Sequence, residues 1–303
     1  MLMQPQQAAT NKVSAAITSG GKWPRITLVT PTYNRAMYLE ETILSVITQD
    51  YPNLEYVIVD GGSADPEVLR IIRKYEDKLA WWLSERDGGH AEAIRKGFER
   101  STGEIMNWVC SDDTLLPGAL RTIGKCFMEH PEADVVYGNA LLMDKQSHVK
   151  RELRSVPYSR LALAVGMNLH QTSVFWTRGL YERVGGQVGG EDLEFTRYEP
   201  DSDLFFRFAK VNARWVFVRE PLASFRIHAA QTSSIDAQTN WEYRWRALRR
   251  EFPFLSKRPV YYTVRSLMRV RQIYWHLRQG EAGYVLRGLL RRAKIIRDTK
   301  GLV

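Results

Sequence analysis

The sequence predicts an α/β protein: a mostly parallel sheet sandwiched by helices, followed by a C-terminal helical appendage. Two observations predict this class. Short apolar runs alternate with helix-spaced segments over the first two-thirds of the 303 residues, and carboxylates follow several of those runs. Strands that alternate with helices of this length form parallel sheets covered on both faces. With 44% hydrophobic residues the chain can bury a large core, so global disorder is excluded.

The predicted strands and helices alternate regularly from residue 25 to residue 140. Strands are expected at 25–30, 55–60, 80–85, 104–110 and 134–140, and helices at 38–49, 66–75, 90–103 and 117–130. The first helix is predicted by apolar residues at helical spacing, such as Leu39 and Ile43. Pro66 suits the first turn of the second helix, and Gly103 closes the third.

The rest of the chain divides into three expected regions. Residues 1–23 form a disordered leader, because they are rich in Gln, Ala, Ser and Gly and lack the apolar core of a signal peptide. Residues 24–235 form the α/β domain, which becomes less regular after Tyr158. Residues 236–303 form a basic helical region with three helical segments. No segment is apolar enough to predict a membrane-spanning helix.

Charge is distributed unevenly along the chain. From Trp241 onward there are 16 Lys and Arg against 4 Asp and Glu, whereas the remainder holds 27 against 30. A nucleic-acid-binding protein carries positive charge around its functional site, so we expect no nucleic-acid partner. The two cysteines, Cys110 and Cys126, exclude a disulfide scaffold and a CxxC zinc site. They favour a reducing, cytoplasmic setting.

The segment after the first predicted strand excludes two common nucleotide-binding classes. It reads TPTYNR, without the glycines of a dinucleotide-binding GxGxxG turn, and the chain contains no GxxxxGK[ST]. A dehydrogenase and a P-loop NTPase are therefore not expected.

Carboxylates gather instead at the ends of the predicted strands. Asp60, Asp87, Asp112 and Asp113 all follow a strand, and ligands of parallel sheets bind beyond the carboxyl ends of the strands. The Gly61-Gly62 pair lets a ligand approach the backbone. Asp60 could accept hydrogen bonds from a base or a ribose; the other interpretation is a helix cap or an Asx turn.

Asp112 and Asp113 together predict a cation site. Adjacent carboxylates repel each other, and burying them without compensation is costly. Mg²⁺ or Mn²⁺ would remove that conflict, because these ions bind one or two carboxylates together with substrate phosphates. A solvated turn is the alternative interpretation.

Seven segments in this order resemble the family 2 glycosyltransferases, which have the GT-A nucleotide-diphospho-sugar fold. The segments are TPTYNR, VIVDGGSADP, SERDGGHAEAIRKGF, TGEIMNWVCSDDTLLPGAL, HQTSVFW, EPDSDLFFRF and FRIHAAQTS, between residues 25 and 234. The resemblance implies an inverting, metal-dependent transfer. A sugar would move from a nucleotide-diphosphate donor, with a UDP-sugar favoured, to a hydroxyl of a glycan or lipid-linked acceptor.

The resemblance also implies roles for individual residues. Asp201 matches the catalytic base, although the family often has Glu-Asp where this chain has Pro200-Asp201. Asp113 matches the metal ligand, with His228 as the second ligand and Asp112 facing the sugar or ribose. The other expected donor contacts are Thr30, Pro31, Tyr33, Arg35, Asp60, Asp87 and Lys96; the expected acceptor or sugar contacts are His170, Gln171, Glu191 and Asp203.

Several of these roles have alternatives that the sequence leaves open. A helix cap is the alternative for Asp201 and Asp203, and a packed or surface side chain is the alternative for His228. Glu191 and Asp192 are rival bases. For the whole chain, the alternatives are a non-catalytic sugar-nucleotide or glycan-binding module and a sugar-phosphate nucleotidyltransferase.

The basic C-terminal region has three interpretations. Its arginines are interleaved with Trp, Tyr and Leu, a combination that suits a helix on an anionic membrane surface. The same faces could instead join two copies of the chain, or form a solvated charged surface. We therefore expect a cytoplasmic protein, peripheral on the cytoplasmic face of the membrane or self-associated.

Overall fold

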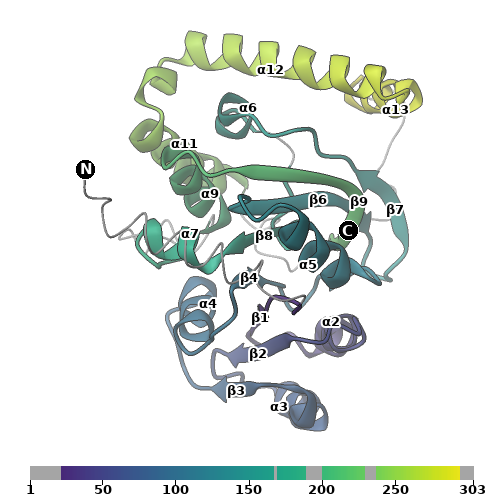
Figure 1. Cartoon of the computed structure of the whole chain (residues 1–303), viewed down its shortest axis with the longest axis vertical. Coiled ribbons are helices and arrows are strands. Elements are labelled where there is room, and N and C mark those ends of the chain that lie inside the picture. The colour runs from purple at the N-terminus through teal and green to yellow at the C-terminus, as the bar shows by residue number, and fades with distance from the viewer. Residues whose placement is uncertain (1–21, 167–168, 189–199, 229–236, 294–303) are drawn as a thin grey trace.

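The computed structural model describes residues 22–166, 169–188, 200–228 and 237–293. In these residues a nine-stranded sheet runs through the molecule in the order β3-β2-β1-β4-β8-β6-β9-β5, with β7 paired to β6 (Figure 1). The strands are β1 (Ile26–Thr32), β2 (Leu54–Asp60), β3 (Trp81–Ser84), β4 (Ile105–Trp108), β5 (Thr114–Leu115), β6 (Val135–Met143), β7 (Val149–Leu153), β8 (Val174–Thr177) and β9 (Trp215–Arg226).

Helices cover both faces of the sheet and one of its ends. The α-helices are α2 (Ala36–Ile47), α3 (Pro66–Lys74), α4 (His90–Glu99), α5 (Ala119–Glu129), α6 (Arg160–Ala164), α7 (Arg178–Arg183), α9 (Pro200–Lys210), α11 (Ala237–Glu251), α12 (Arg258–Arg278) and α13 (Ala282–Arg292). The described residues also form three short 3-10 helices, η1 (Glu76–Lys78), η2 (Gln171–Ser173) and η3 (Pro253–Ser256).

The predicted α/β class with a mostly parallel sheet is confirmed. The ladders of β1 with β2 and β4, of β2 with β3, and of β6 with β9 are parallel and hold most of the paired residues. β8 runs antiparallel between β4 and β6, which makes the sheet mixed. β1 is buried throughout, as expected for a central strand covered on both faces.

Two hydrophobic cores lie on opposite faces of the sheet, as the alternation of side chains along a strand requires. On β1, Val29 belongs to the core under α4, whereas Leu28 belongs to the core under α2, α3 and α5. Gly97 lets α4 approach β1 closely, because a Cβ at this position would lie 2.5 Å from Cγ1 of Val29.

The predicted elements up to residue 140 are all present, with boundaries shifted by up to four residues. The helix expected to close at Gly103 ends at Glu99. The helix expected from Pro117 begins at Ala119, because Gly118 caps it in the left-handed region with φ +78°. The strand expected to reach residue 110 ends at Trp108, so residues 110–113 form a loop at the rim of the sheet.

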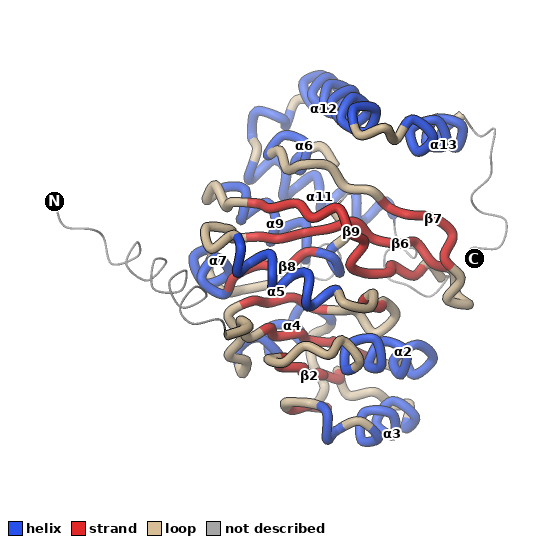
Figure 2. The backbone as a smooth tube through the Cα atoms, turned by 45° about the vertical axis from the view of Figure 1, so that its right-hand side comes forward, coloured by secondary structure: helices blue, strands red, loops and turns tan. Residues whose placement is uncertain are grey.

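The C-terminal helices pack on the same core as the sheet. Leu248 of α11 and Phe252 share a core cluster with Trp176 of β8. Figures 1 and 2 show α12 beyond the β9 side of the sheet, next to α6, with α13 at the far end of α12. None of the described helices is long and apolar enough to cross a membrane. The division expected at residue 235 falls outside the described residues and stays a prediction.

Both ends of α12 are fastened to the rest of the protein. Near its beginning, the Tyr261 ring packs against Trp245 of α11, with the centroids 5.0 Å apart. Near its end, Trp275 packs against Phe217 of β9 at 5.8 Å. Just beyond, Glu281 forms ion pairs with Arg154 and Arg219 at 3.0 and 2.8 Å. α12 is therefore held against the sheet, with its opposite face turned outward.

Candidate active site

The loop after β4 brings Asp113 into the interior. Its Oδ1 accepts a hydrogen bond from the backbone N–H of Arg226 at 3.0 Å, and its Oδ2 accepts one from the Thr172 hydroxyl at 2.8 Å. Its backbone carbonyl accepts a hydrogen bond from the Thr42 hydroxyl at 2.7 Å. Burial and then the charge of Asp112 raise the pKa of the Asp113 carboxyl. Asp113 thus joins α2, η2 and β9, and both its oxygens already have partners.

Asp112, one residue earlier, faces a histidine instead. Its Oδ2 lies 2.9 Å from Nε2 of His228, just beyond β9, and 20% of its side-chain surface stays exposed. The His228 ring packs against the Tyr38 ring of α2, with the centroids 5.1 Å apart. An imidazole nitrogen and a carboxylate oxygen this close can bind one divalent cation.

A buried arginine holds this loop in place. The Arg226 guanidinium is fully buried: its Nε donates to the backbone carbonyl of Asp112 at 2.7 Å, and it forms an ion pair with Glu41 at 2.7 Å. It also donates to the Ser147 hydroxyl at 2.8 Å and lies 4.3 Å from the centroid of the Tyr38 ring. A buried charge needs such partners, and here they fix the position of Asp112 relative to His228.

Three further groups surround this loop. Sγ of Cys110 is 4.0 Å from Nε2 of His90, the first residue of α4. Burial raises the pKa of the Cys110 thiol, and the charges of Asp113, Asp112 and Asp201 raise it further. Burial lowers the pKa of His90 to about 4, while the charge of Asp112 acts in the opposite direction. Asp201, in the first turn of α9, therefore lies close enough to act electrostatically on the loop.

Asp60, the last residue of β2, is fully buried and has internal partners. Its Oδ2 accepts hydrogen bonds from the Ser63 N–H at 3.0 Å and the Ser84 hydroxyl at 2.7 Å, and its Oδ1 accepts one from the Ser63 hydroxyl. Asn34, in the loop after β1, donates its N–H to the Ser63 hydroxyl at 2.7 Å. These bonds match the turn interpretation of Asp60 and join the loops after β1 and β2.

Two buried oxygens beside these loops have no hydrogen-bond partner within the described residues. Oδ1 of Asp87 accepts a hydrogen bond from the Gly89 N–H at 2.8 Å, but Oδ2 has no partner. The Thr32 hydroxyl at the end of β1 has none either. A Cβ at Gly61 would lie 3.0 Å from the Asp87 carboxylate, so the glycine keeps this space open. Burial raises the pKa of Asp87. Unpaired buried oxygens are costly, so they indicate a site for a hydrogen-bond donor.

The predicted donor contacts in and just after β1 are buried in some cases and exposed in others. Thr30 and Pro31 are buried in β1, and the Thr30 hydroxyl shares a hydrogen bond with the Tyr56 hydroxyl at 3.0 Å. Tyr33 is 59% exposed, and Arg35 is half-buried at the beginning of α2. The structure thus brings Tyr33 and Arg35 to the surface and keeps the Thr30 side chain inside.

Lys96 on α4 is engaged with neighbouring carboxylates. Its Nζ lies 2.8 Å from Glu85 and 3.3 Å from Glu92. Arg95 pairs with Glu99 at 2.6 Å on the same helix. Both cations therefore stabilise α4 and its connection to β3 within the described structure.

The predicted acceptor contacts His170 and Gln171 lie at the beginning of η2, with His170 just before its first residue. Nε2 of Gln171 donates to the Asn107 side-chain oxygen at 2.7 Å and to the Trp108 carbonyl at 2.9 Å. Nε2 of His170 is buried without a described partner, and burial and then Arg151 lower the pKa of His170 to about 4.

Asp203 lies on a different face of α9 from Asp201. It is fully buried, and its carboxylate pairs with Arg207 of the same helix at 2.8 Å and with Arg250 of α11. The predicted residues Glu191 and Asp192 lie outside the described residues.

The side chains around Asp112 fit a divalent cation. One ligand atom each from Cys110, Asp112 and Asp113 lie within 4.8 Å of one another. His228 adds an imidazole nitrogen beside Asp112. Because Asp113 is buried next to another carboxylate, a cation would relieve their repulsion. Asp112 belongs to both groups, since its carboxylate lies beside the His228 imidazole and within the set that includes Cys110 and Asp113.

Carboxylates lie at the carboxyl ends of the strands in a mostly parallel sheet, beside a histidine and beside a helix that carries a further aspartate. This arrangement is that of a GT-A-like sugar-nucleotide transferase fold. Residues 27–177 match the family described as Glycosyl transferase family 2. An uncharacterized glycosyltransferase of Rickettsia prowazekii is 30% identical over 231 residues, which cover 73% of this chain and 69% of the relative. The chain belongs to the family 2 glycosyltransferases.

Two solved structures show the same fold. TarS 1-349 of S. aureus in complex with UDP has a TM-score of 0.57 and 20% identity, over 75% of this chain and 65% of that chain. The mannosyltransferase PcManGT of Pyrobaculum calidifontis, in complex with GDP-Man and Mn²⁺, has a TM-score of 0.54 and 19% identity, over 85% and 78%.

Sequence reasoning did not identify Arg226, His90, Thr172 or Thr32 as parts of the site. Arg226 and Thr172 contact Asp113 from 113 and 59 residues further along the chain. His90 follows Gly88-Gly89 at the beginning of a predicted helix, a place that could have marked it. For Arg226, the signal in the sequence was its position two residues before His228, which was itself a predicted ligand.

Proposed function

We propose that this chain transfers a sugar, with inversion, from a nucleotide-diphosphate donor to a hydroxyl of a glycan or lipid-linked acceptor. The observation that carries the proposal is the group of side chains at and after the loop that follows β4. Asp112 faces His228 at 2.9 Å, and the charge of Asp201 acts on the same loop from α9. A carboxylate beside an imidazole, with a further carboxylate in electrostatic range of the same loop, supports the proposal.

The donor's nucleoside would lie near the ends of β1 and β3. The free Oδ2 of Asp87 can accept from an N–H or a ribose hydroxyl, and the exposed Tyr33 ring can pack on the base. A UDP-sugar is our preferred donor, in line with the UDP in TarS 1-349. PcManGT holds GDP-Man, so the nucleobase of the donor must be tested directly.

The sequence alone favours Asp113 as the metal ligand, but we propose Asp112 with His228 in its place. Both oxygens of Asp113 are already hydrogen-bonded, whereas Asp112 is more exposed and adjacent to an imidazole. A bound Mn²⁺ or Mg²⁺ would neutralise the charge of the leaving diphosphate. PcManGT was solved with Mn²⁺.

Asp201 is the proposed base. It would take the proton of the acceptor hydroxyl while that oxygen bonds to the anomeric carbon. The bond from that carbon to the donor phosphate breaks on the opposite face, and the nucleoside diphosphate leaves with the electron pair. This displacement inverts the anomeric centre and needs one carboxylate, which α9 supplies.

The outer face of α12 supports the peripheral membrane location that we propose. Leu267, Val270, Tyr274 and Leu277 are 49–64% exposed and recur at helical spacing opposite the packed face. The same helix carries five arginines. An apolar stripe on an arginine-rich helix suits the interface of an anionic cytoplasmic membrane surface, where a lipid-linked acceptor would be found.

The proposal predicts a specific effect of Asp201→Asn. This change keeps the shape and removes the proton acceptor, so UDP release from the preferred UDP-sugar should fall about 10²- to 10⁴-fold. Binding of UDP with Mn²⁺, measured by calorimetry, should stay within about two-fold. Asp77→Asn, the same change at an exposed site on η1, is the matched control.

Two results would contradict this role. An equal loss of UDP binding would mean that Asp201 holds the donor or the fold. Unchanged turnover would mean that another residue is the catalytic base.

A panel of UDP, GDP, dTDP and CDP in thermal unfolding would first identify the nucleobase of the donor, because a ligand that binds the native state raises its melting temperature. Tight binding with no turnover of any sugar donor would favour a non-catalytic binding module.

A further inference from the structure

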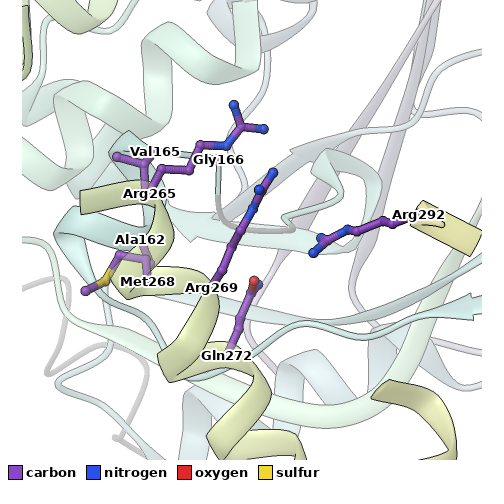
Figure 3. Close-up of a pocket in the computed structure, with 8 residues that line it drawn as sticks. All are labelled: Ala162, Val165, Gly166, Arg265, Met268, Arg269, Gln272 and Arg292. Carbon is purple, nitrogen blue, oxygen red and sulfur yellow. The ribbon is translucent and has the colours of Figure 1, made fainter. Parts of the chain in front are cut away.

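A hollow between α6, α12 and α13 gathers arginines from two helices. Arg265 and Arg269 of α12 and Arg292 of α13 line it, with Gln272 beside them (Figure 3). The apolar wall comes from Ala162, Val165, Gly166 and Met268. Figure 3 shows Arg292 pointing toward Arg269, with Arg265 one helical turn away. The three side chains thus reach toward one space from separate parts of the chain.

Two neighbouring arginines are paired with a carboxylate, whereas the three arginines of the hollow pair with no carboxylate of the described residues. Arg154, just after β7, and Arg219, on β9, both pair with Glu281. No described carboxylate forms an ion pair with Arg265, Arg269 or Arg292. Burial, followed by the charges of Arg265 and Arg292, lowers the pKa of Arg269. The cluster therefore carries mutual repulsion that an anion would relieve.

The shape and chemistry of the hollow suit one kind of anion. Guanidinium groups match the oxygens of phosphate in bidentate pairs, and the Gln272 amide adds a neutral donor. The hollow opens to solvent, so an anion can reach the three guanidinium groups from outside.

We propose that this hollow binds a phosphate or diphosphate group, through Arg265, Arg269 and Arg292. The site is separate from the donor site, since its residues come from α6, α12 and α13, whereas every proposed donor contact precedes α11. The inference therefore does not rest on the proposed transfer reaction. The group could belong to a lipid at the surface on which α12 lies, or to a free phosphate compound.

The test uses the full chain and inorganic pyrophosphate. Calorimetry is done with EDTA, so that the donor site lacks the cation that would hold a diphosphate there. The wild-type chain should bind pyrophosphate and gain melting temperature. Arg269→Ala and Arg292→Ala should each weaken binding about ten-fold, the effect of one charge-assisted hydrogen bond. The control Arg278→Ala, an exposed arginine of α12 outside the hollow, should stay within two-fold.

Stability without ligand separates a binding role from a structural one. Removal of one of three like charges should leave the melting temperature of Arg269→Ala and Arg292→Ala unchanged or slightly raised. A lower melting temperature for both would show that the arginines hold the fold, which would overturn the proposal. Absence of pyrophosphate binding, or an equal loss with Arg278→Ala, would also overturn it.

A second arm identifies the source of the phosphate. Phosphatidylcholine vesicles with and without phosphatidic acid are added to the wild-type chain at constant pyrophosphate. Displacement of pyrophosphate by the phosphatidic acid vesicles alone would support the site and assign it to a lipid headgroup. Pyrophosphate binding without displacement would support the site and assign it to a free phosphate compound.

Discussion

Asp112 and Asp113 are adjacent in sequence, but the structure gives them different surroundings. Asp113 accepts hydrogen bonds from Thr172 and from the backbone of Arg226, whereas Asp112 faces His228. A strand end followed by two aspartates predicts that a carboxylate pair lies at the rim. Which oxygen points outward depends on η2 and β9, whose contacts come from far along the chain, so the sequence leaves that choice open.

This difference gives a prediction for two matched substitutions. Asp112→Asn should abolish the extra melting-temperature gain from UDP plus Mn²⁺ and leave the unliganded melting temperature nearly unchanged. Asp113→Asn should lower the unliganded stability by about 1–3 kcal/mol, because an amide N–H₂ would face a donor at one of its two buried hydrogen bonds. The measurement is thermal unfolding with UDP, with Mn²⁺, and with both.

The opposite pattern would return the metal to Asp113. In that case Asp113→Asn alone would lose the response to Mn²⁺ and keep its stability. His228→Gln is the companion variant, since it removes the imidazole beside Asp112 and should weaken the response to Mn²⁺ in the same direction.

At the scale of elements, α9 shows how spacing decides the role of each aspartate. Asp201 and Asp203 are two residues apart, so they lie on different faces of the helix. Asp203 is buried against α11, and Asp201 acts on the loop after β4. The sequence predicts the helix and places two carboxylates in its first turn. It does not show which face meets α11, because that depends on the position of Arg250.

The contact between α9 and α11 yields a stability prediction. Arg250→Ala should lower the free energy of unfolding by about 1–3 kcal/mol, because it removes a charged hydrogen-bond donor from the fully buried Asp203 carboxylate. Arg249→Ala, the exposed neighbour without a described carboxylate partner, should cost clearly less. Urea unfolding followed by circular dichroism would measure both. Equal effects would mean that the ion pair adds nothing to the stability of this contact.

At the scale of the molecule, the sequence predicted the fold class and the order of elements, but not how closely the basic region joins the rest. The uneven charge suggested a separate C-terminal region. In the structure, Tyr261 is buried in the core that also contains Trp176, and Trp275 packs against it. Apolar periodicity marks a packed face on a helix, yet it does not tell which surface that face covers. Removing α12 would therefore expose core residues, so point substitutions test its outer face better than truncation.

The last prediction concerns that outer face. Val270→Glu places a charge in the middle of the exposed apolar stripe of α12, and it should reduce co-sedimentation with anionic vesicles several-fold. Val149→Glu, on the exposed part of β7, is the control and should bind like the wild type. Salt should weaken wild-type binding only in part, because the Debye length falls from about 10 Å at 0.1 M to about 3 Å at 1 M, while apolar contacts persist. Equal sedimentation of both variants would reject the membrane interface. If Val270→Glu instead dissolves an oligomer seen by light scattering, the stripe joins two copies of the chain.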